Sequence, residues 1–350
     1  LVPVFLFLLV LITKIPSFNL PYYWDDFNYV ISAVNHVYTS QITPFLWEYG
    51  LGHTPFFYLL AGLIFRIFGD SLIVSHLIII IFSFLSVYFT YLIGKELFNK
   101  RTGIIASLIL LFTPIFFSFS GLFNLEMPLT AFVIMSLYSS IINKYTLYAL
   151  FGSLAVLTKE TAISVAVAML FIKILKEKNK LKIALIYSIP ILSFLLWMIL
   201  NKIHYGLFLY PIGTSIILFE PIKNFFNFLI ILKYIFFDDF RWIIVSLFFI
   251  QFLSFKKIKN FSKIKIPLLA SLISLIMLFY APSLLSKYST IFPNIESYLI
   301  LIRNFSLLFS LIIFIIMTNL KEVTKFILNR KLWGLLIIIL AFIGMHALVI

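Results

Sequence analysis

Two adjacent carboxylates, Asp25 and Asp26, lie in a stretch that is otherwise aromatic and apolar. A carboxylate within hydrogen-bond reach of a substrate hydroxyl can act as a general base, and a partly dry aromatic setting raises its pKa toward a useful range. The second acid of such a pair would orient the first or hold a cation. The alternative interpretation is that both are solvated loop acids, or that they cap a helix beginning near Phe27, since Asp is a favoured N-cap residue.

Glu126 is the next candidate, because it is the single charge in the short turn 120–128 between two apolar segments. In one interpretation it is a second carboxylate that faces Asp25 across a site. In the other it only caps the helix that enters at Pro128, where an acid at the N-terminal end is favourable.

Three basic side chains complete the candidate set. His53 opens an apolar segment, Lys159 lies beside Glu160 between two short apolar segments, and Lys287 precedes Pro293 in a later loop. Cations gathered at helix ends suit a phosphate group, which they bind as point charges. The alternatives are that His53 is a surface or capping residue, that the lysines extend toward water at the membrane surface, and that Lys159 pairs with Glu160.

The composition requires a membrane protein. Of the 350 residues, 63% are hydrophobic and 11% are charged, whereas soluble domains carry about 25% charged residues. The net charge of +14 does not indicate nucleic acid, because the basic residues form short clusters between apolar runs, where they act as topology signals. Walker A, HExxH, GxSxG and Gly-rich dinucleotide motifs are absent, which argues against ATPases, metalloproteases and hydrolases of those kinds.

The apolar runs predict an all-α, polytopic membrane protein of about 11 transmembrane helices. Most runs are close to the length that crosses a hydrocarbon layer of about 30 Å, and the segments 145–157 and 161–175 are shorter, which a locally thinned bilayer accommodates. We take residues 1–12 as part of the first span, since they lack the flanks of a signal peptide. The predicted spans are 1–19, 71–94, 103–119, 128–143, 145–157, 161–175, 183–200, 241–255, 266–284, 298–319 and 332–350.

The segment 54–68 is apolar but short, and the distribution of charge decides its placement. If it does not cross the membrane, the Lys and Arg clusters all fall on one side, which the positive-inside rule makes cytoplasmic. We therefore predict that 54–68 is an interfacial helix within one external loop, about 20–70, and that 201–240 forms a second external loop. The candidate site then lies on the non-cytoplasmic side of a multi-pass protein of the cell membrane.

These motifs, taken in order, resemble the GT-C class of integral membrane glycosyltransferases, in the branch of protein O-mannosyltransferases and aminoarabinose transferases. Each motif is weak by itself, and the ordered series over residues 1–200 carries the resemblance, with a weaker match near 285–300. The stretches are the acid pair in 24–29, the His-Thr-Pro segment 53–60, the basic turn 94–103, the acid turn 124–129, the Leu-Thr-Lys turn 157–159 and residues 287–293.

The resemblance implies roles for the three acids. Asp25 would be the base that deprotonates the acceptor hydroxyl, and Asp26 and Glu126 would support it or bind a divalent cation. No cofactor is certain; a divalent cation is the candidate. Asp26 replaces the commoner Glu of the family.

The resemblance also implies roles for the basic residues. Lys159 and Lys287 would hold the donor phosphate, and His53 would line the donor side. Thr54 replaces a Pro of the family pattern, and Lys287 replaces an Arg. A lysine at that position loses the bidentate contacts that a guanidinium makes with phosphate.

The predicted function is transfer of a sugar from a polyprenyl-phosphate-sugar donor to an acceptor hydroxyl of a protein, lipid or glycan. One membrane module would span 1–350, with a catalytic core in 1–200 and further helices in 201–350. The alternative is a lipid-linked saccharide flippase or other transporter, which would place charges in the middle of its spans. A structural subunit without catalysis is a third interpretation.

Overall fold

The structure, a computed structural model, describes residues 1–23, 26–50, 52–176 and 179–210. These residues divide into two compact units. Every regular element in the described ranges is a helix, which confirms the all-α prediction for this part of the chain.

Each of the seven spans predicted before residue 201 corresponds to helical structure. The third span is broken at Thr113, where the short helix α7 (Pro114–Phe119) follows α6. The helices are α1 (Val2–Lys14), α5 (Leu72–Leu97), α6 (Lys100–Phe112), α8 (Glu126–Ile141), α9 (Tyr145–Thr158), α10 (Ile163–Lys176) and α11 (Lys180–Tyr205).

Two of these helices, α5 and α11, are long and apolar enough to cross a membrane, with 26 residues each. At 1.5 Å per residue each is about 39 Å long, which exceeds a hydrocarbon layer of about 30 Å. The four spans predicted at 241–255, 266–284, 298–319 and 332–350 lie outside the described residues, so the total of about 11 stays a prediction.

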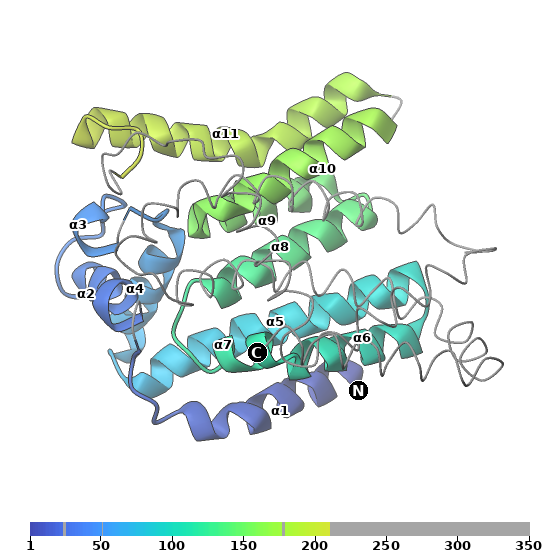
Figure 1. The fold of residues 1–350 in the computed structure, drawn as a ribbon, viewed down its shortest axis with the longest axis horizontal. Coiled ribbons are helices and arrows are strands. Elements are labelled where there is room, and N and C mark those ends of the chain that lie inside the picture. The colour runs from blue at the N-terminus through green and yellow to red at the C-terminus, as the bar shows by residue number, and fades with distance from the viewer. Residues whose placement is uncertain (24–25, 51, 177–178, 211–350) are drawn as a thin grey trace, which may run out of the picture. The chain divides into compact units, whose positions relative to one another are not determined.

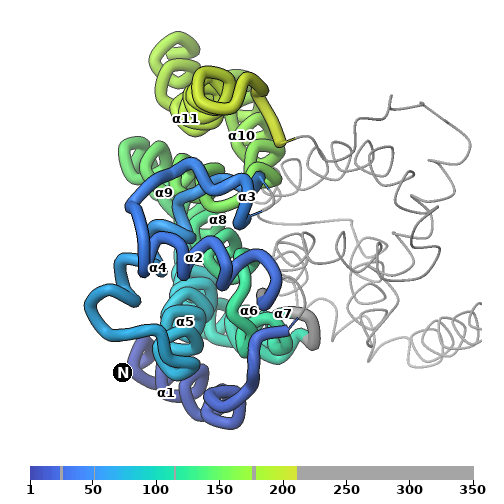
Figure 2. The backbone as a smooth tube through the Cα atoms, turned by 90° about the vertical axis from the view of Figure 1, so that its left-hand side faces the viewer, coloured from blue at the N-terminus to red at the C-terminus, as the bar shows by residue number. Residues whose placement is uncertain are grey.

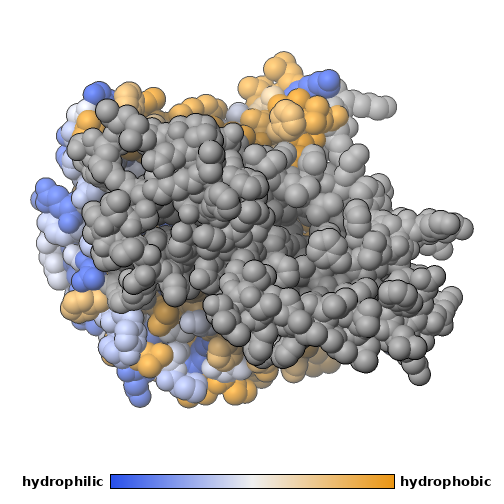
Figure 3. Space-filling view, in the orientation of Figure 1, coloured by the Kyte–Doolittle hydropathy of each residue, from blue (hydrophilic) through white to orange (hydrophobic). Residues whose placement is uncertain are grey.

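Within the first unit, residues 1–93 and 110–210, α9 packs against both α8 and α11, and α10 packs against α11. Gly152 of α9 permits a close approach to the proline inside α11, since a Cβ atom there would lie 2.7 Å from Pro190 Cγ. Small residues allow such approaches between apolar helices. Figure 3 shows apolar side chains over α11, where Leu185, Leu192 and Leu196 are exposed. This surface suits contact with lipid.

The predicted external loop forms four short elements at one end of the first unit (Figures 1 and 2). They are the π-helix η2 (Asp26–Val30), α2 (Ile31–Thr39), α3 (Trp47–Gly50) and α4 (Phe56–Phe68). The helix expected in 54–68 is present as α4, and its 13 residues correspond to about 20 Å. Figure 2 shows α2 and α4 lying across this end of the helices, which supports their placement at the membrane surface.

Helices α2 and α4 are held together by polar and close contacts. Arg66 of α4 donates hydrogen bonds from Nε to the Val37 carbonyl at 2.9 Å and from Nη2 to the Ser40 carbonyl at 3.0 Å. These carbonyls belong to the C-terminal end of α2, where a cation satisfies groups that have no helical partner. A Cβ on Gly62 would lie 2.6 Å from Val37 Cβ, so the two helices meet at a glycine.

Aromatic residues join the external loop to the end of α11. Trp47 stacks on Tyr205 with ring centroids 4.1 Å apart, and Phe45 stacks on His204 at 3.9 Å. Such pairs contribute beyond the area that they bury. The loop segment that leads to His53 is therefore fixed against α11.

The described part of the second unit, residues 94–109, contains the end of α5, a basic turn and most of α6. Asn99 immediately precedes α6, and its side-chain oxygen accepts a hydrogen bond from the Thr102 N–H at 3.0 Å. This is the geometry of a helix N-cap.

Candidate functional site

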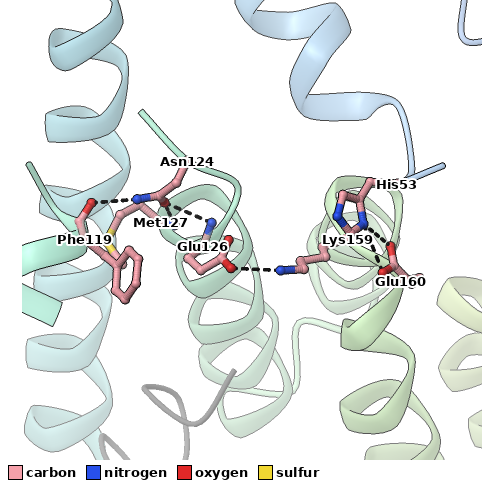
Figure 4. A network of polar contacts seen from close by, with 7 residues as sticks. All are labelled: His53, Phe119, Asn124, Glu126, Met127, Lys159 and Glu160. Carbon is pink, nitrogen blue, oxygen red and sulfur yellow. Dashed lines mark hydrogen bonds and ion pairs between the residues drawn. The ribbon is translucent and has the colours of Figure 1, made fainter. Parts of the chain in front are cut away.

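Three of the six predicted site residues come together at the end of the first unit where the predicted external loop lies. Glu126, Lys159 and His53 belong to two neighbouring ion pairs, shown in Figure 4. The backbone of Asp26 begins the π-helix η2. Asp25 and Lys287 lie outside the described residues, as does the Asp26 side chain.

Lys159 and Glu126 form a buried ion pair. Lys159 follows the last residue of α9 and Glu126 is the first residue of α8. Lys159 Nζ donates to Glu126 Oε1 at 2.8 Å, and the two side chains are only 9% and 8% exposed. A charge in such surroundings is tolerated only when it is paired. The pair therefore fixes the end of α9 beside the start of α8.

His53 and Glu160 form the second pair. His53 Nδ1 lies 3.0 Å and 3.1 Å from the two carboxylate oxygens of Glu160. Next to it, Thr54 Oγ1 donates to the Val156 carbonyl at 3.0 Å. The start of the segment leading into α4 is thus attached twice to the end of α9.

Lys159 does not pair with Glu160 in the structure, so this interpretation of the sequence is wrong. Lys159 has extended backbone angles, φ −155° and ψ 131°, between α9 and the 3-10 turn η3 (Glu160–Ala162). Successive side chains of an extended backbone point to opposite sides. Lys159 therefore contacts α8, while Glu160 contacts the external loop.

The carboxyl group of Glu160 is strongly acidic in this setting. Partial burial opposes its ionisation, but the charge and hydrogen bond of His53, together with the charge of Lys159, outweigh this effect and lower the pKa to about 2. Glu160 is therefore ionised at neutral pH and is unsuited to be a proton acceptor in catalysis.

Asn124 connects the turn before α8 to the start of that helix. Its Nδ2 donates to the Phe119 carbonyl at 3.0 Å, and its Oδ1 accepts from the N–H groups of Glu126 at 3.0 Å and Met127 at 3.2 Å. Phe119 ends α7, so one buried side chain satisfies the end of one helix and the beginning of the next.

The chain just before the acid pair is held at the start of α5. Tyr22 Oη and Ser75 Oγ share a hydrogen bond of 2.7 Å, and His76 Nε2 lies 3.0 Å from the Leu20 carbonyl. The tyrosine hydroxyl is partly buried, which raises its pKa, and its hydrogen bond to Ser75 acts in the opposite direction. Residues 20–22 therefore have a defined position three residues before Asp25.

A divalent cation does not fit the described residues alone. No group of three or more His, Cys, Asp and Glu side chains within the described ranges is arranged to hold a metal ion. Glu126, the candidate ligand among them, is 2.8 Å from the Lys159 ammonium, and that positive charge opposes a second cation.

Sequence reasoning missed three residues of this end of the molecule. Asn124 lies in the acid turn without a predicted role, Glu160 enters only as a partner of Lys159, and His76 lies within an apolar run. A signal existed for His76, because an ionisable residue within a membrane segment calls for a partner. For Asn124 the signal was its position two residues before an acid that begins a helix.

A comparison with known families supports the resemblance that was inferred from the sequence. The sequence model of the family described as dolichyl-phosphate-mannose-protein mannosyltransferase matches residues 52–205. This range includes His53, Glu126 and Lys159. No curated protein and no solved structure is significantly similar to the chain. The resemblance inferred from the sequence is thus confirmed over residues 52–205, which match this mannosyltransferase family of the GT-C type.

Proposed function

We propose that this protein is a multi-pass membrane glycosyltransferase that moves a sugar from a polyprenyl-phosphate carrier to an acceptor hydroxyl on the non-cytoplasmic side. The observation that carries the proposal is the family match over residues 52–205, which contains the two ion pairs at one end of the helices. We treat residues 1–350 as one membrane module, with the catalytic core within 1–200.

In this proposal the buried lysine recognises the donor. Lys159 is held by Glu126, so its ammonium has a defined position before the donor binds. A phosphate that reaches this end of the helices would compete for the same ammonium group. Lys287, from a later loop, would supply a second positive charge, and His53 would line the donor side of the site.

Asp25 is proposed to be the general base. It would accept the proton of the acceptor hydroxyl while the acceptor oxygen forms a bond to the anomeric carbon and the bond from that carbon to the phosphate oxygen breaks. The polyprenyl phosphate leaves as an anion, so it needs positive charge rather than a general acid. One displacement of this kind inverts the anomeric configuration.

Two observations support the assignment of Asp25. The chain before it is anchored at Leu20 and Tyr22, and the π-helix η2 begins immediately after it. Its neighbour Asp26 would orient it or hold a divalent cation supplied by the medium. Addition of a chelator tests that cation directly.

The proposal is tested with tritiated dolichyl-phosphate mannose added to membranes of cells that express the protein. Wild-type membranes should move label from the donor into a protein, glycan or new lipid product. Asp25→Asn should lower the rate by about 10²–10⁴-fold, the contribution of a general base. Asp70→Asn, an exposed acid of the same external loop, serves as the control and should keep the wild-type rate. An Asp25→Asn protein with undiminished transfer would end the assignment.

A further inference from the structure

The side chain of Asn124 makes three hydrogen bonds at the point where Glu126 enters α8, as Figure 4 shows. It is only 5% exposed. The contact to a carbonyl identifies Nδ2 as the donor, and the contacts to two N–H groups identify Oδ1 as the acceptor, so the orientation of the amide follows from its partners.

These bonds determine where the Glu126 carboxylate lies. Glu126 is the first residue of α8, and the first residues of a helix have N–H groups without helical partners. Asn124 accepts from two of them and is itself attached to the Phe119 carbonyl. The backbone that carries Glu126 is therefore held from both sides, and the carboxylate meets Lys159 at 2.8 Å.

We propose that Asn124 is a positioning residue for sugar transfer: it places Glu126 so that Glu126 orients Lys159 toward the donor phosphate. The inference rests on the proposed function. A misplacement of about 1 Å in such a constellation is enough to cost about 10²-fold in rate. Asn124 touches no reacting group in this scheme, and it acts through the ion pair.

A purely structural role as a helix cap is the competing explanation, and the chain contains matched controls for it. Asn179 caps α11, where its side chain accepts from the Lys182 N–H at 3.3 Å. Asn99 caps α6 in the same manner. Both are exposed, unlike Asn124, and neither is next to a residue of the candidate site.

The experiment compares Asn124→Asp with Asn124→Leu, which are similar in size to asparagine. Aspartate keeps an oxygen that accepts from the two N–H groups, whereas leucine cannot accept. Transfer of label from tritiated dolichyl-phosphate mannose is measured per amount of folded protein, and folding is measured by thermal unfolding in detergent. Asn179→Leu and Asn99→Leu are prepared in parallel.

We expect Asn124→Leu to lose at least about tenfold in transfer rate, and Asn124→Asp to recover a large part of this loss. Asn179→Leu and Asn99→Leu should stay within about twofold of the wild type. The inference is overturned if Asn124→Leu transfers at the wild-type rate, if Asn124→Asp is no better than Asn124→Leu, or if the control caps lose as much activity.

Failure to fold is also decisive. If Asn124→Leu does not accumulate as a folded protein while both control variants do, the result for Asn124→Asp decides between the two roles. Reduced but measurable transfer by Asn124→Asp supports a positioning role. Unfolding of Asn124→Asp as well would make the role of Asn124 structural. Wild-type membranes that transfer no label would overturn the proposed function itself. Active wild-type membranes with an unaffected Asn124→Leu would overturn this inference alone.

Discussion

Lys159 and Glu126 are charged groups that the protein keeps almost completely away from water. Each has the other within 2.8 Å, with side chains 9% and 8% exposed. Burial of either charge alone would cost several kilocalories per mole of free energy, because the charge loses its contact with water. The mutual attraction of the pair offsets most of that cost. Such an arrangement contributes little net stability, so the pair is a candidate for a role in binding or catalysis.

Removal of one member of this ion pair should therefore destabilise the protein much more than removal of both members. Lys159→Met removes the ammonium group that lies 2.8 Å from the buried Glu126 carboxylate, and it should lower the free energy of unfolding by about 3–5 kcal/mol. Lys159→Met combined with Glu126→Leu should recover most of that loss and still transfer no sugar. Thermal unfolding in detergent measures the first effect, and the transfer assay measures the second.

The control for this prediction is Lys182→Met, which removes an exposed lysine from the start of α11. It should leave both stability and activity close to those of the wild type. A double variant that is less stable than Lys159→Met would contradict the assignment of the ion pair as the reason for the loss.

Glu160 makes the stability of the folded protein depend on pH in the acidic range. Its pKa is lowered from 4.5 to about 2 in the folded protein. An acid of this kind stabilises the folded state above its unfolded pKa, and the contribution is lost as the pH falls toward the folded pKa. The stabilisation by Glu160 is thus complete above about pH 5 and declines between about pH 4.5 and pH 2.

The melting temperature of the wild type should therefore exceed that of Glu160→Gln at about pH 6, and this difference should shrink on acidification to about pH 3. Glu48→Gln replaces an exposed acid of the same external loop and supplies the comparison. If the difference in melting temperature between the wild type and Glu160→Gln is the same at about pH 6 and about pH 3, the pair with His53 does not hold the Glu160 carboxylate ionised.

At the scale of elements, the segment between α3 and α4 determines where His53 lies. Gly52 has φ +76°, and a Cβ atom built there would lie 2.0 Å from the Tyr210 Cβ. Only glycine combines a positive φ with so close an approach. Tyr210, which lies beyond the end of α11, and Gly52, which precedes His53, are therefore in contact.

Gly52→Ala should displace this segment and lower transfer by at least about tenfold, because His53 moves with it. Gly69→Ala is a matched control, since Gly69 has φ +84° at the end of α4 with open space around its Cβ position. It also places an alanine at a positive φ, which costs about 1–3 kcal/mol of backbone strain, without the collision. Equal effects of the two substitutions on transfer would attribute the loss to strain alone.

At the scale of the whole molecule, the order of the helices implies an alternating path through the membrane. The turns at 112–126 and 158–163 lie at the end of the first unit that carries α2–α4, whereas the turn at 141–145 lies at the other end (Figure 1). The positive-inside rule assigns the turns rich in lysine and arginine to the cytoplasm. We therefore expect the ion pairs to face the outside.

The absence of cysteine from the chain makes this topology directly measurable. Gln41→Cys in the external loop and Thr146→Cys near the start of α9 introduce single, exposed thiols without a change of charge. A maleimide that cannot cross membranes should label Gln41→Cys in intact cells, and should label Thr146→Cys only after permeabilisation. The reverse pattern would place the candidate site in the cytoplasm and contradict the proposed reaction on the outer face.

The sequence by itself determined the helical class, the seven helical segments before residue 201 and the short helix in 54–68. These features are local, because the length and polarity of a segment decide whether it crosses a hydrocarbon layer. The sequence also determined which charged residues gather at one end, since alternating spans bring every second turn to the same side.

Only the tertiary structure decided which of those charges meet. Lys159 and Glu126 are 33 residues apart, and His53 and Glu160 are 107 residues apart. The adjacent residues Lys159 and Glu160 contact different partners because an extended backbone turns their side chains to opposite sides. Partner choice depends on how helix ends approach one another in space, and spacing along the chain does not contain that information.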